Sequence, residues 1–304
     1  MKHKKKQSDV RITPRTFLEP LLYAAPFLLI CLVFTVWPVI NVFLNSVYEG
    51  YDFIKNTYQS VGLSNFKELF HDRYFISSLK NTFSYVFITV PVSTVFALLF
   101  SVLLSRKIKL GGLFQTAYFL PLITSSIAIG LVWKYMFNSD YGVINSMLNL
   151  FGIDGLKWLR QPKDAMAAMC VFGIWKSLPT SIIMFMSGLQ SIDDRYYIAA
   201  RLDGAGSWKQ FRRITIPLLS PTIALVLSTR VISASKVFNE VFVLWGGEPG
   251  PARTMYTVVF YIWESFFENW EISLASAAAL VLFAIVFILT IIQLFLQKKL
   301  VFYK

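Results

Sequence analysis

The sequence predicts an all-α, polytopic membrane protein with six transmembrane helices and with both termini in the cytoplasm. Three observations support this fold class: the apolar composition, the length of the uncharged stretches, and the placement of basic residues between them. Of the 304 residues, 56% are hydrophobic and only 15% are charged, whereas about a quarter of a soluble domain is charged. Because the apolar residues gather in long runs, this excess indicates a chain embedded in the lipid bilayer.

Six apolar stretches have the length that a helix of about 20 residues needs to cross a bilayer. Four of them carry no charge, and the other two contain Lys176 in one case and Arg230 and Lys236 in the other. The six expected helices lie at 20–48, 81–105, 110–133, 165–189, 214–237 and 273–297.

The basic residues orient these helices, because cytoplasmic segments carry an excess of Lys and Arg. With the N-terminus inside, 17 of the 29 Lys and Arg residues fall in cytoplasmic segments and 8 in external loops, while 12 of the 17 acids are external. The net charge of +12 would suggest nucleic acid in a soluble protein; here it reflects topology, and no nucleic-acid partner is expected. The basic start of the chain precedes an apolar run without a cleavage site, so the first helix is expected to remain uncleaved. The basic residues at the start of the chain either fix the orientation of the first helix or contact anionic lipid.

The chain divides into four segments and three external loops. The third loop, 238–272, carries an aromatic run that suits either an interfacial belt, which is the preferred interpretation, or the faces of sugar rings. The segments are a basic cytoplasmic N-terminus (1–19), the first helix with its external loop (20–80), a core (81–297) that contains a structured polar loop (190–217), and a cytoplasmic tail (298–304).

Charged side chains inside a membrane are costly and usually face protein or water. Lys176, Arg230 and Asn239 are therefore candidates for a polar passage or for inter-helix polar contacts. For Lys176 and Arg230 the preferred interpretation is hydrogen bonding between helices. Lys236 is either a further candidate for the passage or, like Lys134, extends to the outer headgroups.

The polar loop between the fourth and fifth expected helices has the signals of two short helices. Ser191, Asp193 and Asp194 supply start signals for the first helix. Gly204 suits a left-handed helix end, where a β-carbon would be penalised. Ser207 and Gln210 have the spacing of a capping box for the second helix. Pro217 suits the first turn of the next membrane helix, where no proline amide is needed.

The spacing of this loop resembles the coupling loop of the membrane subunits of ABC importers, which reads E-A-A, three residues, G, nine residues, I-x-L-P. Ile198 stands where that family has glutamate, and Ile216 where it has leucine. The first difference removes one polar contact that the family can make with its ATPase subunit. The alternative is an ordinary amphipathic hairpin at the membrane surface. The positions in register are Ala199, Ala200, the step Asp203-Gly204-Ala205, Ile214 and Pro217.

From about residue 81 to its end the chain resembles a type-I ABC-importer permease of the carbohydrate class, similar to the maltose-system and glycerol-phosphate-system permeases. The stretches that carry this resemblance are 141–145, 174–176, 188–191 and 238–247. The resemblance implies that a set of loop residues couples this chain to an ATPase: Ala199, Ala200, Arg201, Asp203, Gly204, Ala205, Ile214 and Pro217.

The resemblance also implies the partners and the place of the chain. They are two ABC ATPase subunits, a second and related permease, an extracytoplasmic solute-binding protein, a carbohydrate substrate and the bilayer of a bacterial cell membrane. The sequence has no G-x-x-x-x-G-K-[ST] motif, so ATP and Mg²⁺ are expected on the ATPase, and the chain itself is expected to be non-catalytic and to bind no cofactor or metal. The alternatives are an ABC importer for a non-sugar solute and a stand-alone channel or secondary transporter.

Overall fold

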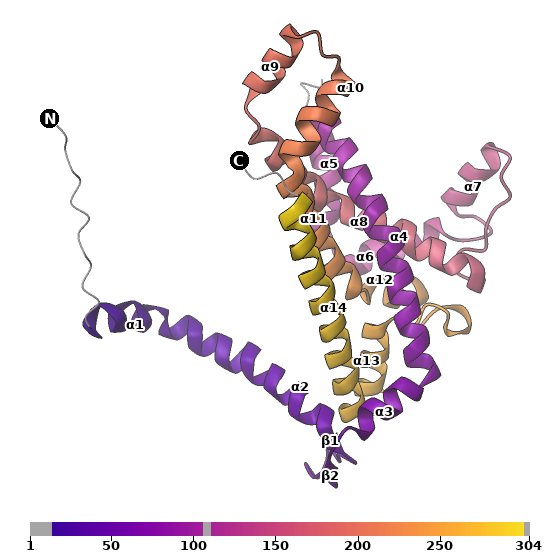
Figure 1. The fold of residues 1–304 in the computed structure, drawn as a ribbon. Helices are drawn as coiled ribbons and strands as arrows, with labels where there is room; N and C mark the ends of the chain where they lie inside the picture. The colour runs from indigo at the N-terminus through magenta and orange to yellow at the C-terminus, as the bar shows by residue number, and fades with distance from the viewer. Residues whose placement is uncertain (1–13, 106–110, 301–304) are drawn as a thin grey trace.

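The computed structural model describes residues 14–105 and 111–300, and these are helical apart from loops and one short hairpin (Figure 1). In the hairpin, β1 (Tyr48–Glu49) pairs antiparallel with β2 (Ser60–Val61). The all-α prediction is therefore confirmed. The helices are α1 (Pro14–Cys31), the π-helical η1 (Leu32–Val36), α2 (Trp37–Val47), α3 (Ser64–His71), α4 (Arg73–Leu104), α5 (Gly111–Ile123), α6 (Ser126–Met136), α7 (Val143–Leu150), α8 (Pro162–Gln190), α9 (Asp194–Leu202), α10 (Ser207–Gln210), the π-helical η2 (Phe211–Thr215), α11 (Ile216–Ser235), α12 (Asn239–Trp245), the 3-10 helix η3 (Pro251–Arg253), α13 (Val258–Phe267) and α14 (Ile272–Leu300).

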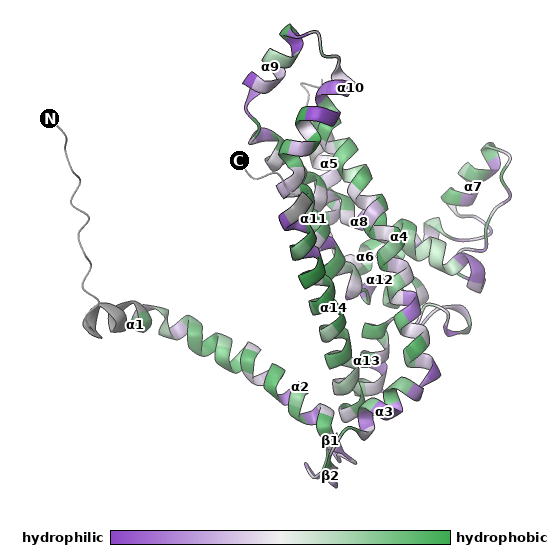
Figure 2. Cartoon of the chain, viewed as in Figure 1, coloured by the Kyte–Doolittle hydropathy of each residue, from purple (hydrophilic) through white to green (hydrophobic). Residues whose placement is uncertain are grey.

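Five helical runs of the described chain are long and apolar enough to cross a membrane, and they match five of the six expected helices. Figure 2 shows that the long helices are mainly hydrophobic, whereas α9 and α10 carry many hydrophilic residues. The second of the five begins at Arg73 rather than at 81, because the Asp72 carboxylate accepts a hydrogen bond from the Tyr74 backbone N–H and caps it. The five runs are Leu21–Val47, Arg73–Leu104, Pro162–Gln190, Ser207–Ser235 and Ile272–Lys298.

The third expected helix, 110–133, is not continuous, and this part of the prediction is wrong. It is divided into α5 and α6, which are separated by Thr124 and Ser125. Ser125 has extended ψ (129°), so the helical bonding stops there. The Thr124 backbone N–H and hydroxyl both donate to the Leu120 carbonyl, at 3.2 and 2.8 Å, so the last turn of α5 is closed just before the break. Apolar periodicity does not detect such a break, because both halves remain hydrophobic.

Proline produces a second departure from the predicted helices. Pro217 lies in the first turn of α11, as predicted, but α11 is not a separate helix, because the helical run is continuous from Ser207 to Ser235. A π-helical turn, η2, ends two residues before Pro217, and η1 likewise ends two residues before Pro38. Proline cannot donate to the preceding turn, and a wider π turn accommodates the missing hydrogen bond without ending the helix.

The centre of the bundle is the pair α4 and α8, which pack along each other and against α11 (Figure 1). Close approach depends on glycine: a β-carbon at Gly173 would lie 2.0 Å from the Tyr85 hydroxyl oxygen. Small residues let membrane helices approach at such contacts. By contrast, α1 and α2 extend away from the bundle in Figure 1, and α2 meets α14 and α3 at its end.

The aromatic run of the third external loop is mostly core rather than interfacial belt. Tyr256, Phe260 and Tyr261 expose no more than 3% of their surface, because α13 folds back against α4 and α14. Only the end of the run, Phe267 and Trp270, remains largely exposed, at 62% and 63%. The loop predicted at 238–272 is therefore partly helical, and its buried aromatic rings stabilise the packing of α13 against α4 and α14.

Candidate functional site

The polar loop holds α9 and α10, joined by a glycine turn. Asp193 caps α9, since its carboxylate accepts from the Arg195 backbone N–H at 2.9 Å. At the other end Gly204 has φ +72°, as predicted, and the Ala205 N–H donates to the Ala200 carbonyl at 2.8 Å. These are the bonds of a helix end that requires left-handed backbone at Gly204.

The predicted capping box is wrong. Gly206 is the N-cap of α10 with an extended backbone, so Ser207 is already inside the helix and makes no cap bond. The Gln210 side chain instead donates to the Ala205 carbonyl at 2.6 Å. This bond ties α10 back to the end of the glycine turn and keeps the two short helices together.

The loop exposes apolar side chains on a polar background. Ile198, Leu202 and Trp208 are 48%, 84% and 73% exposed, and α9 has no buried residue. An apolar group in a polar surface marks a protein contact more often than chance. The eight predicted coupling residues lie in this loop: Ala199, Arg201, Asp203 and Gly204 are exposed, and Ala200, Ala205, Ile214 and Pro217 are half-buried.

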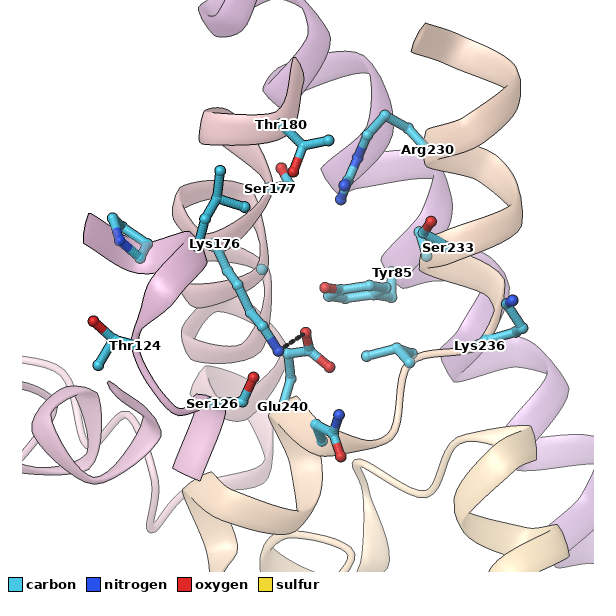
Figure 3. Close-up of a pocket in the computed structure, with 16 residues that line it drawn as sticks. Tyr85, Thr124, Ser126, Lys176, Ser177, Thr180, Arg230, Ser233, Lys236 and Glu240 are labelled. Carbon is cyan, nitrogen blue, oxygen red and sulfur yellow. Dashed lines mark hydrogen bonds and ion pairs between the residues drawn. The ribbon is translucent and has the colours of Figure 1, made fainter. Parts of the chain in front are cut away.

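A second site lies within the bundle, where a cavity of about 440 Å³ opens between α4, α5, α8 and α11. Hydroxyl groups line much of it, including those at the break between α5 and α6 (Figure 3). The discontinuous helix thus contributes polar groups at the wall of a cavity, which is where irregular backbone is tolerated in a membrane. Its lining residues with polar side chains are Tyr85, Thr124, Ser126, Lys176, Ser177, Thr180, Arg230, Ser233, Lys236, Asn239 and Glu240.

The structure brings Lys176, Arg230 and Asn239 to this one cavity. Lys176 Nζ lies 3.0 Å from Glu240 Oε1, and both side chains are mostly buried. Sequence reasoning missed Glu240, which was assigned to an external loop. The available signal was Lys176 itself, because a lysine within an apolar helix needs an acidic partner.

Arg230 differs from Lys176 in forming no ion pair with a described carboxylate. Its Nε is buried and has no hydrogen-bond partner among the described residues. Figure 3 shows its side chain projecting from α11 toward the space between α4 and α8, above Tyr85. The cavity therefore presents a guanidinium group to whatever enters it.

Comparison with known proteins places this arrangement in a family. The model of the binding-protein-dependent transport system inner membrane component matches residues 75–302. The chain belongs to this family. This permease is 31% identical over 273 residues to the trehalose/maltose transport system permease protein MalF of Thermococcus litoralis, covering 90% of this chain and 91% of that protein.

A second relative of the permease is the arabinooligosaccharides transport system permease protein AraP of Halalkalibacterium halodurans. It is 32% identical over 280 residues, which cover 91% of this chain and 87% of that protein. Among solved structures, a chain of a bacterial ABC transporter involved in the import of the acidic polysaccharide alginate superposes with a TM-score of 0.81. The match covers 94% of this chain and 97% of that chain at 23% identity, and it shows the shared fold. The permease is thus a multi-pass membrane protein of a binding-protein-dependent transport system.

Proposed function

We propose that this permease is a transmembrane subunit of an ATP-driven ABC importer that carries a sugar or an oligosaccharide into a bacterial cell. One observation carries the proposal: the exposed loop joins two of the helices that line the cavity. α8 holds Lys176 and leads into α9, and α11 holds Arg230 and follows η2. At 1.5 Å per residue, both side chains lie about 20 Å from the loop along their helices. A displacement of the loop therefore moves two walls of the cavity.

The energy source is a separate pair of ATPase subunits, which bind ATP and Mg²⁺. Their contact is the loop from Ala199 to Pro217, with Leu202 and Trp208 as apolar anchors because both are largely exposed. Closing of the ATPases must favour one orientation of the permease over the other, since a ligand shifts only an equilibrium between states that it binds unequally. Both termini and this loop are cytoplasmic, as the basic residues indicate.

The permease works beside a second, related permease and receives its substrate from an extracytoplasmic binding protein. The relatives named for trehalose/maltose and arabinooligosaccharides support a carbohydrate substrate. A cavity of about 440 Å³ lined by hydroxyl groups has the polar character that such a substrate requires.

A crosslinking experiment tests the loop contact. The native cysteines, Cys31 and Cys170, are replaced by serine, and single cysteines are introduced as Leu202→Cys or Leu150→Cys. These two leucines are matched, because each is 84% exposed, but Leu150 lies on α7 beside an external loop. Leu202→Cys is expected to crosslink to the ATPase in membranes, and Leu150→Cys is not.

The same two variants test the orientation. A membrane-impermeant maleimide added to intact spheroplasts is expected to label Leu150→Cys and to label Leu202→Cys only after permeabilisation. Labelling of Leu202→Cys from outside, or the absence of any ATPase crosslink, contradicts the proposal. ATP-independent uptake by the chain alone in liposomes would instead assign it as a stand-alone transporter.

A further inference from the structure

We infer that the saccharide carried by this permease bears an acidic group, and that Arg230 is the residue that binds this group in the cavity. The inference rests on the proposed function and specifies the substrate class of the same cavity.

The charge of the cavity carries the inference. Of the described residues that line it, Lys176, Arg230 and Lys236 are basic and only Glu240 is acidic. The Glu240 carboxylate is already paired with Lys176 at 3.0 Å. No described carboxylate lies within 4.0 Å of a nitrogen of Arg230 or Lys236. Neither Arg230 nor Lys236 therefore forms an ion pair with a described residue, and the cavity carries a net positive charge.

Of the two unpaired cations, Arg230 is the one whose position suits it to bind the acidic group of the substrate. Its Nε is buried without a partner, and it points toward Tyr85, Ser177 and Thr180, whereas Lys236 lies farther from Lys176 and projects away from it (Figure 3). An unpaired guanidinium in a membrane helix is unfavourable. Its planar donors match a carboxylate or a phosphate in a bidentate arrangement.

A neutral sugar would use the hydroxyl groups of the cavity and leave Arg230 unpaired, whereas an acidic sugar would neutralise it. In a site partly shielded from water this attraction is stronger than at an exposed surface. The cavity therefore selects for a saccharide that carries a carboxylate or a phosphate, with its ring beside the hydroxyl groups and its acidic group at Arg230.

The test uses the whole importer in proteoliposomes, with both permeases, the ATPases and the binding protein. Three probes are compared: an oligouronide, its carboxyl-reduced neutral counterpart, and a sugar phosphate. The readout is the ratio of ATP-driven uptake of each acidic probe to that of the neutral probe. Each ratio is internal to a variant, so a lower amount of folded protein cancels, and the binding protein is the same throughout.

For at least one acidic probe, Arg230→Gln is expected to lower this ratio by tenfold or more, and Arg230→Lys to lower it less, because lysine keeps the charge but not the planar donors of the bidentate contact. The affected probe identifies the acidic group as a carboxylate or a phosphate. If Arg230→Gln transports nothing, Arg230→Lys is measured in its place and is expected to give a ratio below that of wild type. Lys236→Gln removes the other unpaired cation of the cavity and is expected to lower the ratio less, because Lys236 projects away from Lys176. Lys298→Gln is the control, because it removes one positive charge at the end of α14, outside the cavity.

Two negative results separate the inference from the proposed function. Equal acidic-to-neutral ratios in wild type, Arg230→Gln and Lys236→Gln, with ATP-driven uptake of the neutral sugar intact, overturn the inference and leave the importer assignment standing. ATP-driven uptake of none of the saccharides overturns the proposed function, and the inference with it.

Discussion

The hydroxyl of Tyr197 lies 3.0 Å from the hydroxyl of Thr215, and this hydrogen bond joins α9 to the π-helical turn that leads into α11. Thr215 is only 6% exposed and Tyr197 is half-buried, so the bond is largely shielded from water. It connects the surface proposed to meet the ATPase with the helix that carries Arg230. A rigid connection of this kind lets the loop and α11 move as one unit.

Loss of this bond is expected to weaken coupling rather than folding. A single neutral hydrogen bond contributes about 1 kcal/mol, so Tyr197→Phe is expected to lower solute uptake per ATP hydrolysed by about two- to fivefold, with little change in the amount of folded protein. Thr215→Val should give a similar loss. The double variant should lose no more than either single variant, because all three lack the same bond.

The matched control is Tyr135→Phe, since the structure assigns no hydrogen bond to that exposed hydroxyl (66% exposed). Unchanged uptake per ATP in Tyr197→Phe would show that the bond does not transmit force.

Gly204 gives a second prediction, with an unusually close control. Gly204 and Gly152 share φ +72°, and neither has a neighbour within 4 Å of a built β-carbon. An arginine at either position therefore carries the same backbone penalty, about 1–2 kcal/mol. At neither position does the β-carbon meet another described atom of the permease. Gly204→Arg is expected to abolish uptake because its side chain occupies the surface that meets the ATPase. Gly152→Arg should retain uptake. A comparable loss of uptake in both variants would show that backbone strain alone accounts for the effect.

Local rules explain why much of this loop could be predicted from sequence. The Asp193 cap and the left-handed Gly204 depend only on neighbours within a few residues, and the structure shows both. The capping box failed for a local reason as well: Gly206 takes the N-cap position, and sequence spacing alone does not distinguish that register from one in which Ser207 is the cap.

The cavity could not be predicted to the same extent, because it depends on contacts between distant segments. Lys176 and Glu240 are 64 residues apart in the chain, and Glu240 lies at the start of α12, a helix that the sequence reads as loop. The break at Thr124 and Ser125 likewise lies at the wall of the polar cavity, and hydropathy alone does not locate it because the sequence is apolar on both sides.

The Lys176–Glu240 pair leads to a stability prediction. The side chains are 24% and 15% exposed, so removing one partner leaves a poorly solvated charge. Lys176→Met or Glu240→Gln is expected to destabilise the permease by about 2 kcal/mol, measured as a lower melting temperature in detergent. The exchange Lys176→Glu with Glu240→Lys should recover part of the loss.

An exposed ion pair of the same permease serves as the control for this measurement. Arg160 lies 3.3 Å from Asp140, with side chains 64% and 65% exposed, and Asp140→Asn should cost less than about 1 kcal/mol. Equal effects of Glu240→Gln and Asp140→Asn would show that the cavity is as well solvated as the surface.

Helix packing at Gly173 gives a fourth prediction. A β-carbon there would lie 2.0 Å from the Tyr85 hydroxyl oxygen and 2.8 Å from its Cζ, so the buried Tyr85 ring would have to move or α4 and α8 would have to separate. Gly173→Ala is expected to destabilise the permease by about 1–3 kcal/mol, and adding Tyr85→Phe should recover part of this by removing the nearest atom. Gly112→Ala is the control, because nothing lies within 4 Å of that position. A melting temperature of Gly173→Ala equal to that of Gly112→Ala would contradict the close contact.

Glu271, just before α14, gives a prediction about pH. Burial raises the pKa of this carboxyl above its usual value of 4.5, and the nearby charges of Glu68 and Asp72 raise it further. A carboxyl whose pKa is raised on folding stabilises the folded state below its unfolded pKa, and this stabilisation is lost as pH rises through the folded pKa. Glu271→Gln should therefore melt higher than wild type at neutral pH and equal to it near pH 4.5. The gain should be small because the side chain is exposed to solvent.

The measurement is the melting temperature of each variant between pH 4.5 and neutral pH. Glu248→Gln is the control, because it removes another exposed carboxylate. A Glu271→Gln protein that melts below wild type at neutral pH would show that the charged carboxylate is stabilising.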